Sequence, residues 1–182
     1  MKMYFSRWKP KGQCPPRKPL KKILWSWFGS FVGIFLIAML EELLKSDGKS
    51  HLLLIGSFGA SAVLIYGAPQ ADFSQPRNLI GGHILSALVG VTIYSLMKEH
   101  MILSCSMSVS LSIAVMHATR TMHPPGGATA LIAVIGGDSI GSLGYKYILS
   151  PVLSGAIILL FIALIINNLS SNPKRHYPTY WL

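Results

Sequence analysis

The chain has 182 residues, of which 51% are hydrophobic and 12% charged, and its formal net charge is +10. So many apolar residues with so few charges exclude an ordinary soluble domain and indicate a membrane protein with several spans. The positive charge does not indicate a nucleic-acid partner, because it is concentrated before the first apolar segment. The basic residues in that stretch are Lys2, Arg7, Lys9, Lys11, Arg17, Lys18, Lys21 and Lys22.

Residues 1–22 form a predicted basic tail. The positive-inside rule places such a tail in the cytoplasm, and its charges attract anionic lipid head groups at the membrane surface. A removable signal peptide is not expected, because the apolar run that follows has spanning length and ends in Glu41 and Glu42. Residues 169–182 form a short C-terminal tail, also expected in the cytoplasm.

Four segments have the length of about 20 residues that crosses the hydrocarbon core. They are residues 24–44, 78–97, 102–119 and 147–168. Within the first two, "GSFVG" (29–33) and "SALVG" (86–90) place small residues four apart, which allows helices to approach closely. We therefore predict four transmembrane helices.

Two shorter apolar segments are interrupted by glycine and proline, at residues 52–69 and 120–137. At one constant shift, "GASAVL" (59–64) aligns with "GATALI" (127–132), and "ILSALV" (84–89) aligns with "VLSGAI" (152–157). We predict an internal repeat, residues 24–97 and 102–168, in which a long helix, a broken short element and a second long helix follow one another. The fold class is an all-α membrane protein with four full spans and two short broken membrane helices.

The stretch "RTMHPPGGATALIAVIGG" (120–137) contains the residues that fit a membrane helix least well. Pro124 and Pro125 lack N–H donors, so a helix should begin there and run to about residue 135. At 1.5 Å per residue it is about 18 Å long and reaches only part of the way through the bilayer. The matching helix of the first repeat should start near Ser57 and end near Tyr66.

A helix start inside the membrane offers free N–H groups and a partial positive charge, so its expected ligand is an anion. We expect the backbone N–H groups of Gly126, Gly127 and Ala128 to bind it. The start of the equivalent helix, at Gly59 and Ala60, should lie opposite. Interrupted segments in corresponding places of two repeats are typical of transporter binding sites.

Polar side chains near these helices are further candidates. Arg120 should raise anion affinity if it faces the pathway, although it could instead reach the head groups or pair with Asp138. His117 and His123 suit proton relay or a hydrogen bond to substrate, or one of them only holds a loop. They lie far from any carboxylate or thiolate in the sequence, so neither a metal site nor a cofactor is expected.

Two polar residues of the first repeat, Asn78 and His83, could also face the interior. On residues 102–119, helical geometry puts Ser104, Ser108 and Ser112 on one face and Ser106 with Ser110 on another. These serines favour helix contact or a polar pathway.

The motif of His123, Pro124 and Pro125, together with "FGASAVLIYGAP" (58–69) and "QPRNLIGGH" (75–83), resembles the HPP family of small integral membrane proteins. The resemblance covers residues 24–168. It implies a four-helix transmembrane protein with a transport role, and nitrite transport is associated with the family.

The topology has two alternatives. Re-entrant short elements would give four crossings, whereas six membrane elements would form an inverted repeat and place Asp72 and Arg77 on the cytoplasmic side. We favour six elements, in a plasma membrane, or the inner membrane if the source is bacterial.

The sequence favours a transporter or channel for a small inorganic anion, with nitrite suggested by the resemblance alone. The alternative is a structural or sensing membrane module, with homo-oligomerisation left open. An intramembrane enzyme is disfavoured, because the apolar region has no paired carboxylates, no serine–histidine–aspartate set and no metal cluster.

Overall fold

The computed structural model describes residues 2–44 and 54–182, and every regular element in those ranges is helical. The first two residues of the predicted interrupted segment 52–69 lie outside the described residues. The α-helices are α1 Lys2–Ser6, α2 Leu20–Leu44, α3 Gly56–Gly67, α4 Pro76–Met97, α5 Met101–Thr119, α6 Pro124–Ile135, α7 Gly137–Gly141 and α8 Ser154–Asn168. Shorter turns are η1 Asp72–Ser74, the π-helical η2 Ile148–Leu153 and η3 Pro173–Arg175.

The four predicted spans are confirmed. Helices α2, α4 and α5, and the combined element Ile148–Asn168, are long and apolar enough to cross a membrane. The last of these is irregular at its start, where Ser150 has non-helical backbone angles before α8 begins. The two short helices, α3 and α6, have 12 residues each. Helix α6 has the predicted bounds, and α3 extends one residue beyond the predicted 57–66 at each end.

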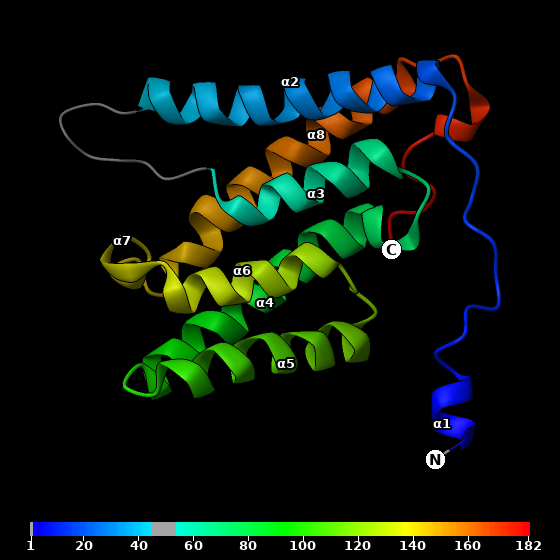
Figure 1. Ribbon diagram of the computed structural model, residues 1–182. Coiled ribbons are helices and arrows are strands. Elements are labelled where there is room, and N and C mark those ends of the chain that lie inside the picture. Colours follow the sequence, from blue (N-terminus) through cyan, green and yellow to red (C-terminus); the bar gives the residue numbers. More distant parts are fainter. Residues whose placement is uncertain (1, 45–53) are drawn as a thin grey trace.

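The long and short helices lie side by side and alternate in direction along the chain (Figure 1). Helix α2 leaves the end where the basic tail joins, and α3 returns to it. We call this the basic end; it includes residues 18–22, 68–77, 119–124 and 168–175. The opposite, far end includes residues 97–101 and 135–148.

Asp72 and Arg77 therefore lie at the basic end, next to the N-terminal tail. Residues 68–71 and tail residues 18, 19, 21 and 22 line the same hollow, which confirms that these two segments meet. This is the end at which a six-element arrangement puts them, since a re-entrant α3 would return the chain to the far end.

The helix contacts follow the same pattern in both halves. Helix α2 packs on α3 and α8, while α5 packs on α6 and α4; α3 and α6 touch each other, and so do α4 and α8. Two copies of a three-helix unit related by a two-fold axis would give this pairing. The internal repeat itself stays a sequence-based prediction that the pairing supports.

Close helix contacts form at the small residues of both predicted motifs. A Cβ atom on Gly29 would lie 2.8 Å from Cδ1 of Tyr66 in α3, and one on Gly90 would lie 2.6 Å from the carbonyl oxygen of Ala130 in α6. A Cβ on Gly126 would in turn lie 2.8 Å from the carbonyl oxygen of Gly82. Helices α4 and α6 can approach this closely only because these positions lack side chains.

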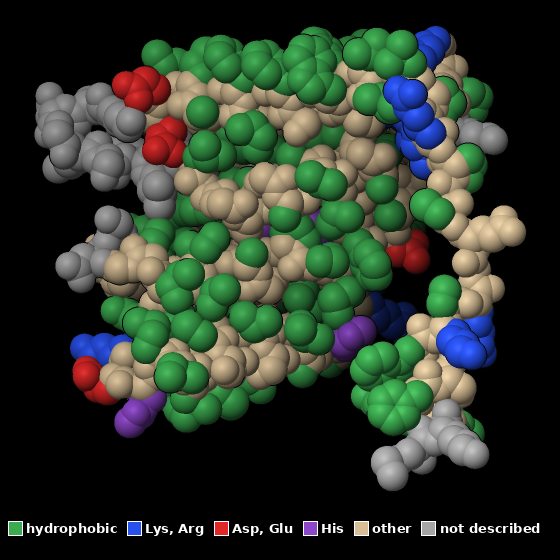
Figure 2. Space-filling view, viewed as in Figure 1, with side chains coloured by type: hydrophobic (Ala, Val, Ile, Leu, Met, Phe, Trp, Pro, Cys, Tyr) green, Lys and Arg blue, Asp and Glu red, His purple; other side chains and the backbone are tan. Residues whose placement is uncertain are grey.

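The outer surface of the bundle suits a lipid environment. Figure 2 shows hydrophobic side chains covering the flank, with the basic and acidic groups gathered towards the two ends. Large apolar residues such as Phe35, Ile113 and Phe161 are exposed there. On α5, Ser104, Ser108 and Ser112 are buried while Ser106 and Ser110 are exposed, so the two predicted serine faces are confirmed.

The position of Asp72 can be tested by cysteine labelling. In a variant without the native cysteines, Asp72→Cys should react with a membrane-impermeant maleimide from the side that labels Cys14 in a variant that keeps only that thiol. Glu99→Cys at the far end should react only from the other side. Labelling of positions 72 and 99 from one common side would contradict the arrangement.

Candidate functional site

Five polar side chains are buried together between α3, α4 and α6. They are Ser57 and Ser61 of α3, His83 of α4, and His123 and Thr129 at and within α6, and each is at most 1% exposed. We call this group the histidine cluster. Polar groups buried in an apolar interior lose water, so each must find hydrogen bonds within the protein.

His83 is at the centre of the histidine cluster. Its Nε2 lies 2.7 Å from Oγ of Ser61, and its Nδ1 lies 2.7 Å from Oγ1 of Thr129. The edge of the ring also packs on Phe58, with the ring centroids 5.3 Å apart. One imidazole of a long helix therefore joins the two short helices.

His123 extends the cluster towards the basic end. Its Nε2 lies 2.9 Å from Oγ of Ser61, and its Nδ1 donates to the carbonyl oxygen of Phe73 over 2.6 Å. At the other limit of the cluster, Thr129 Oγ1 and Ser57 Oγ are 2.8 Å apart. Hydrogen bonds thus run without a break from Ser57 to the carbonyl of Phe73.

The local sequence places His123 in this position. As the residue before Pro124 it is restricted to extended backbone, with φ −139° and ψ 100°, and α6 starts immediately after it. Gly82 of α4 leaves the space that its side chain needs, since a Cβ on Gly82 would lie 2.5 Å from Cβ of His123.

The cluster can hold its hydrogen bonds with two different numbers of protons. Because a carbonyl only accepts, His123 carries a proton on Nδ1. In the structure Thr129 donates to Ser57. If both hydroxyls turned so that Ser57 donated to Thr129, Thr129 would donate to Nδ1 of His83, whose Nε2 would donate to Ser61, and both rings would be neutral.

In the second arrangement of protons, the Thr129 hydroxyl keeps the direction that the structure gives it. When Thr129 donates to Ser57, His83 must carry its proton on Nδ1, so both Nε2 atoms face the single hydroxyl of Ser61. Ser61 has one hydrogen and can donate to only one of them. Satisfying both bonds then takes one additional proton, which makes one imidazole cationic. The geometry therefore suits uptake and release of one proton.

The start of α6 is a poorer anion site than the sequence suggested. Pro124 and Pro125 have no N–H, and the N–H of Gly126 donates to the carbonyl of His123 over 2.8 Å. The amides of Gly127 and Ala128 occupy positions whose regular acceptors are carbonyls one turn earlier. The prolines that start the helix thus also remove the donors that an anion would use.

Gly59 and Ala60 do not lie opposite the start of α6, contrary to expectation. Helices α3 and α6 run antiparallel and overlap, so that Ser57 meets Thr129 and Ser61 meets His123. Gly59 is two positions from both Ser57 and Ser61, so it points away from the face that carries them. Both Gly59 and Ala60 are accordingly exposed on the outside of α3.

Arg120 and His117 also lie outside the cluster. Arg120 ends α5 at the basic end, with a left-handed backbone (φ 59°), and is exposed. The side chain of Asp138, the alternative partner, lies outside the described residues, and a position of Arg120 at the head groups agrees with its exposure. His117 is exposed on the outer face of α5.

Asn78 forms hydrogen bonds within the protein instead of facing a substrate pathway. Its Nδ2 donates to the carbonyl of Met122 over 2.8 Å, and Tyr180 donates to its Oδ1 over 3.4 Å. Asn78 therefore holds the loop before α6 in place.

Sequence reasoning missed Ser57, Ser61 and Thr129 as members of the site. A signal for two of them was present, because Ser61 and Thr129 occupy matching positions in the aligned "GASAVL" and "GATALI". Among the described residues no group of three or more His, Cys, Asp or Glu side chains gathers to hold a metal. The cluster is instead a set of hydroxyl and imidazole groups suited to hydrogen bonding and proton transfer.

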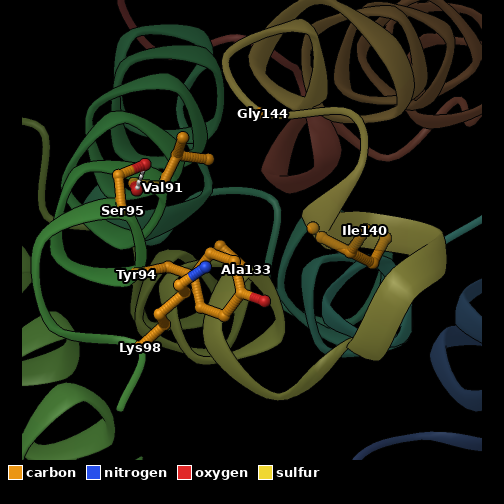
Figure 3. Close-up of a pocket in the computed structure, with 8 residues that line it drawn as sticks. Val91, Tyr94, Ser95, Lys98, Ala133, Ile140 and Gly144 are labelled. Carbon is orange, nitrogen blue, oxygen red and sulfur yellow. Dashed lines mark hydrogen bonds between the residues drawn. The ribbon is translucent and has the colours of Figure 1, made fainter. Parts of the chain in front are cut away.

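A separate hollow of about 290 Å³ opens at the far end, between α4, the end of α6 and α7. Figure 3 shows Lys98 beside Tyr94, Ser95 beside Val91, and Ile140 across the hollow. Among the described residues that line it, Lys98 carries the one charge.

Residues 15–178 match the family model described as the HPP transmembrane region. Two transmembrane proteins of Dictyostelium discoideum are 45% and 44% identical over 183 aligned residues, covering 98% of this chain and 57% and 63% of their own lengths. The chain thus spans about three fifths of the curated relatives it matches. No solved structure matches it.

Removing the hydroxyl of Ser61 should destabilise the protein, because both imidazoles lose a partner in a buried place. We expect Ser61→Ala to lower the free energy of unfolding by about 1–3 kcal/mol. Ser110→Ala is the matched control, since Ser110 is exposed and bonds only to Met107 of its own helix. Thermal unfolding in detergent measures both, and equal melting temperatures would contradict the described bonds.

Proposed function

The chain belongs to the HPP family of transmembrane proteins, and we propose that it transports a small inorganic anion across the membrane through the histidine cluster. The observation that carries the proposal is the unbroken series of hydrogen bonds from Ser57 to the carbonyl of Phe73. Ionisable residues inside membrane segments are costly and generally mark ion or proton pathways.

The second proton arrangement of the cluster supplies the attraction for an anion. One additional proton gives His83 or His123 a positive charge, and the interior's low dielectric strengthens its attraction for a negative ion. The hydroxyls of Ser57, Ser61 and Thr129 can replace part of the ion's hydration. Loss of the same proton removes the charge and favours release.

The described state is closed around the cluster, since none of its side chains is more than 1% exposed. Transport therefore requires the short helices to move apart on one side at a time. Helices α3 and α6 are suited to this, because broken helices at a repeat interface are the elements that form transporter sites. The far-end hollow with Lys98 offers a place where an anion can approach.

Nitrite is the substrate that the family resemblance suggests. It is the anion of a weak acid and therefore accepts a proton, which fits a site that exchanges one. By the positive-inside rule, the basic end faces the cytoplasm.

One observation favours a second candidate function, that of a structural or sensing module. In either proton arrangement the cluster can bond all of its polar atoms internally, so it could serve only to hold α3, α4 and α6 together. The two functions differ in whether a folded variant of the cluster still moves anions.

Substitution of the buried histidines should stop transport without abolishing folding. We expect His83→Gln and His123→Gln to reduce protein-dependent nitrite flux into vesicles by about ten- to hundredfold, in line with the loss of one or two charge-assisted bonds. His117→Gln makes the same chemical change on the exposed face of α5 and should leave flux near normal.

Folded yield and melting temperature must be measured for the same three variants. Flux that falls only in proportion to folded protein would favour the structural module. Normal flux in both buried variants would place the pathway elsewhere.

A further inference from the structure

A second hollow, of about 580 Å³, lies at the basic end of the bundle. It forms where three distant parts of the chain meet: the N-terminal tail with the start of α2, residues 68–71 after α3, and the C-terminal tail. It is separate from the histidine cluster and has no part in the proposed transport.

The lining of this hollow carries positive charge only. Lys18, Lys21, Lys22 and Arg175 all contribute to it, and none of the described residues that line it is acidic. Figure 2 shows basic side chains gathered at this end of the molecule. Four cations around one hollow repel one another, so an anion between them would relieve the repulsion.

Arg175 is the cation of this pocket that the fold buries and holds in place. It is only 4% exposed, and its Nη2 donates to the carbonyl of Tyr66 over 2.7 Å while its Nη1 donates to Oγ of Ser26 over 3.5 Å. Both partners are neutral. Its Nε is buried without a hydrogen-bond partner. Burying a guanidinium with an unused donor costs free energy, unless an anion nearby balances its charge.

We propose that this pocket binds a phosphate group. Phosphate presents several oxygens to which a fixed guanidinium and flexible ammonium groups can donate together. The volume of about 580 Å³ also leaves room for the rest of a phosphorylated molecule.

The pocket borders the apolar flank of the bundle. Trp25, which also lines it, donates from Nε1 to the carbonyl of Ile166 over 3.1 Å and is thereby fixed at this border. Tryptophan is enriched at the level of the lipid head groups. The phosphate can accordingly belong to an anionic lipid head group, and a soluble phosphate compound offers the same chemistry.

The experiment compares two triple variants of the full chain in phosphatidylcholine nanodiscs. Lys18→Gln/Lys21→Gln/Lys22→Gln removes three charges from the pocket. Arg7→Gln/Lys9→Gln/Lys11→Gln removes three exposed charges from the same tail outside it. Phosphatidic acid and inorganic phosphate are titrated separately, and the rise in melting temperature gives the affinity.

Wild type and the outer triple variant should show a saturable rise, with affinity at least about tenfold weaker in the pocket triple variant. Arg175→Lys should also weaken binding, because it keeps the charge and loses the planar donor pair. A response to phosphatidic acid alone identifies a head-group site. A response to inorganic phosphate as well supports a soluble ligand of the same chemistry.

Two results would overturn the proposal. Equal weakening in the two triple variants would show diffuse attraction to the tail rather than binding in a pocket. The absence of a saturable rise with either probe in wild type would show that the pocket takes no phosphate.

Discussion

One imidazole, that of His83, is bonded at both nitrogens to the two helices that are too short to cross the membrane. Helices α3 and α6 have 12 residues each, about 18 Å of helix against a hydrocarbon core of about 30 Å. The bonds to Ser61 and Thr129 fix both short helices against α4. The close packing at Gly82, Gly90 and Gly126 then brings α6 near enough for His123 to join the same hydroxyl.

This constraint also bears on how one set of residues could serve both folding and the proposed transport. A polar cluster inside an apolar bundle stabilises the fold only while all its groups are bonded. Here the bonding can be completed with or without one additional proton, depending on the direction of the Thr129 and Ser57 hydroxyls. A change of charge therefore need not break the contacts that hold α3, α4 and α6 together.

The sequence predicted the helices well because the thickness of the membrane and the geometry of proline leave few alternatives. Residues 78–97 and 102–119 match α4 and α5 within two residues at each end, and Pro124 starts α6 as expected. The site was predicted only in part. His83 and His123 were named, whereas Gly59 and Ala60 were placed on the wrong side of α3. Small residues occur on several faces of α3, so the sequence alone does not show which face is buried.

The interpretation of the "HPPGG" stretch went wrong for a chemical reason. Its prolines were taken to mark a helix start with free amides, but the same residues lack N–H groups, and His123 accepts the next one. Arg120 was considered for the pathway because a charge is costly in lipid. It lies instead at the end of α5, where no such cost arises.

The most direct test of the central claim is the charge carried with each transported anion. Protein-dependent nitrite uptake and luminal pH can be recorded together in proteoliposomes while the membrane potential is varied, with protein-free vesicles subtracted. If the histidine cluster delivers one proton with each anion, uptake is independent of the potential and the lumen gains one proton per nitrite. Uptake that follows the potential, with no accompanying proton, would contradict the account.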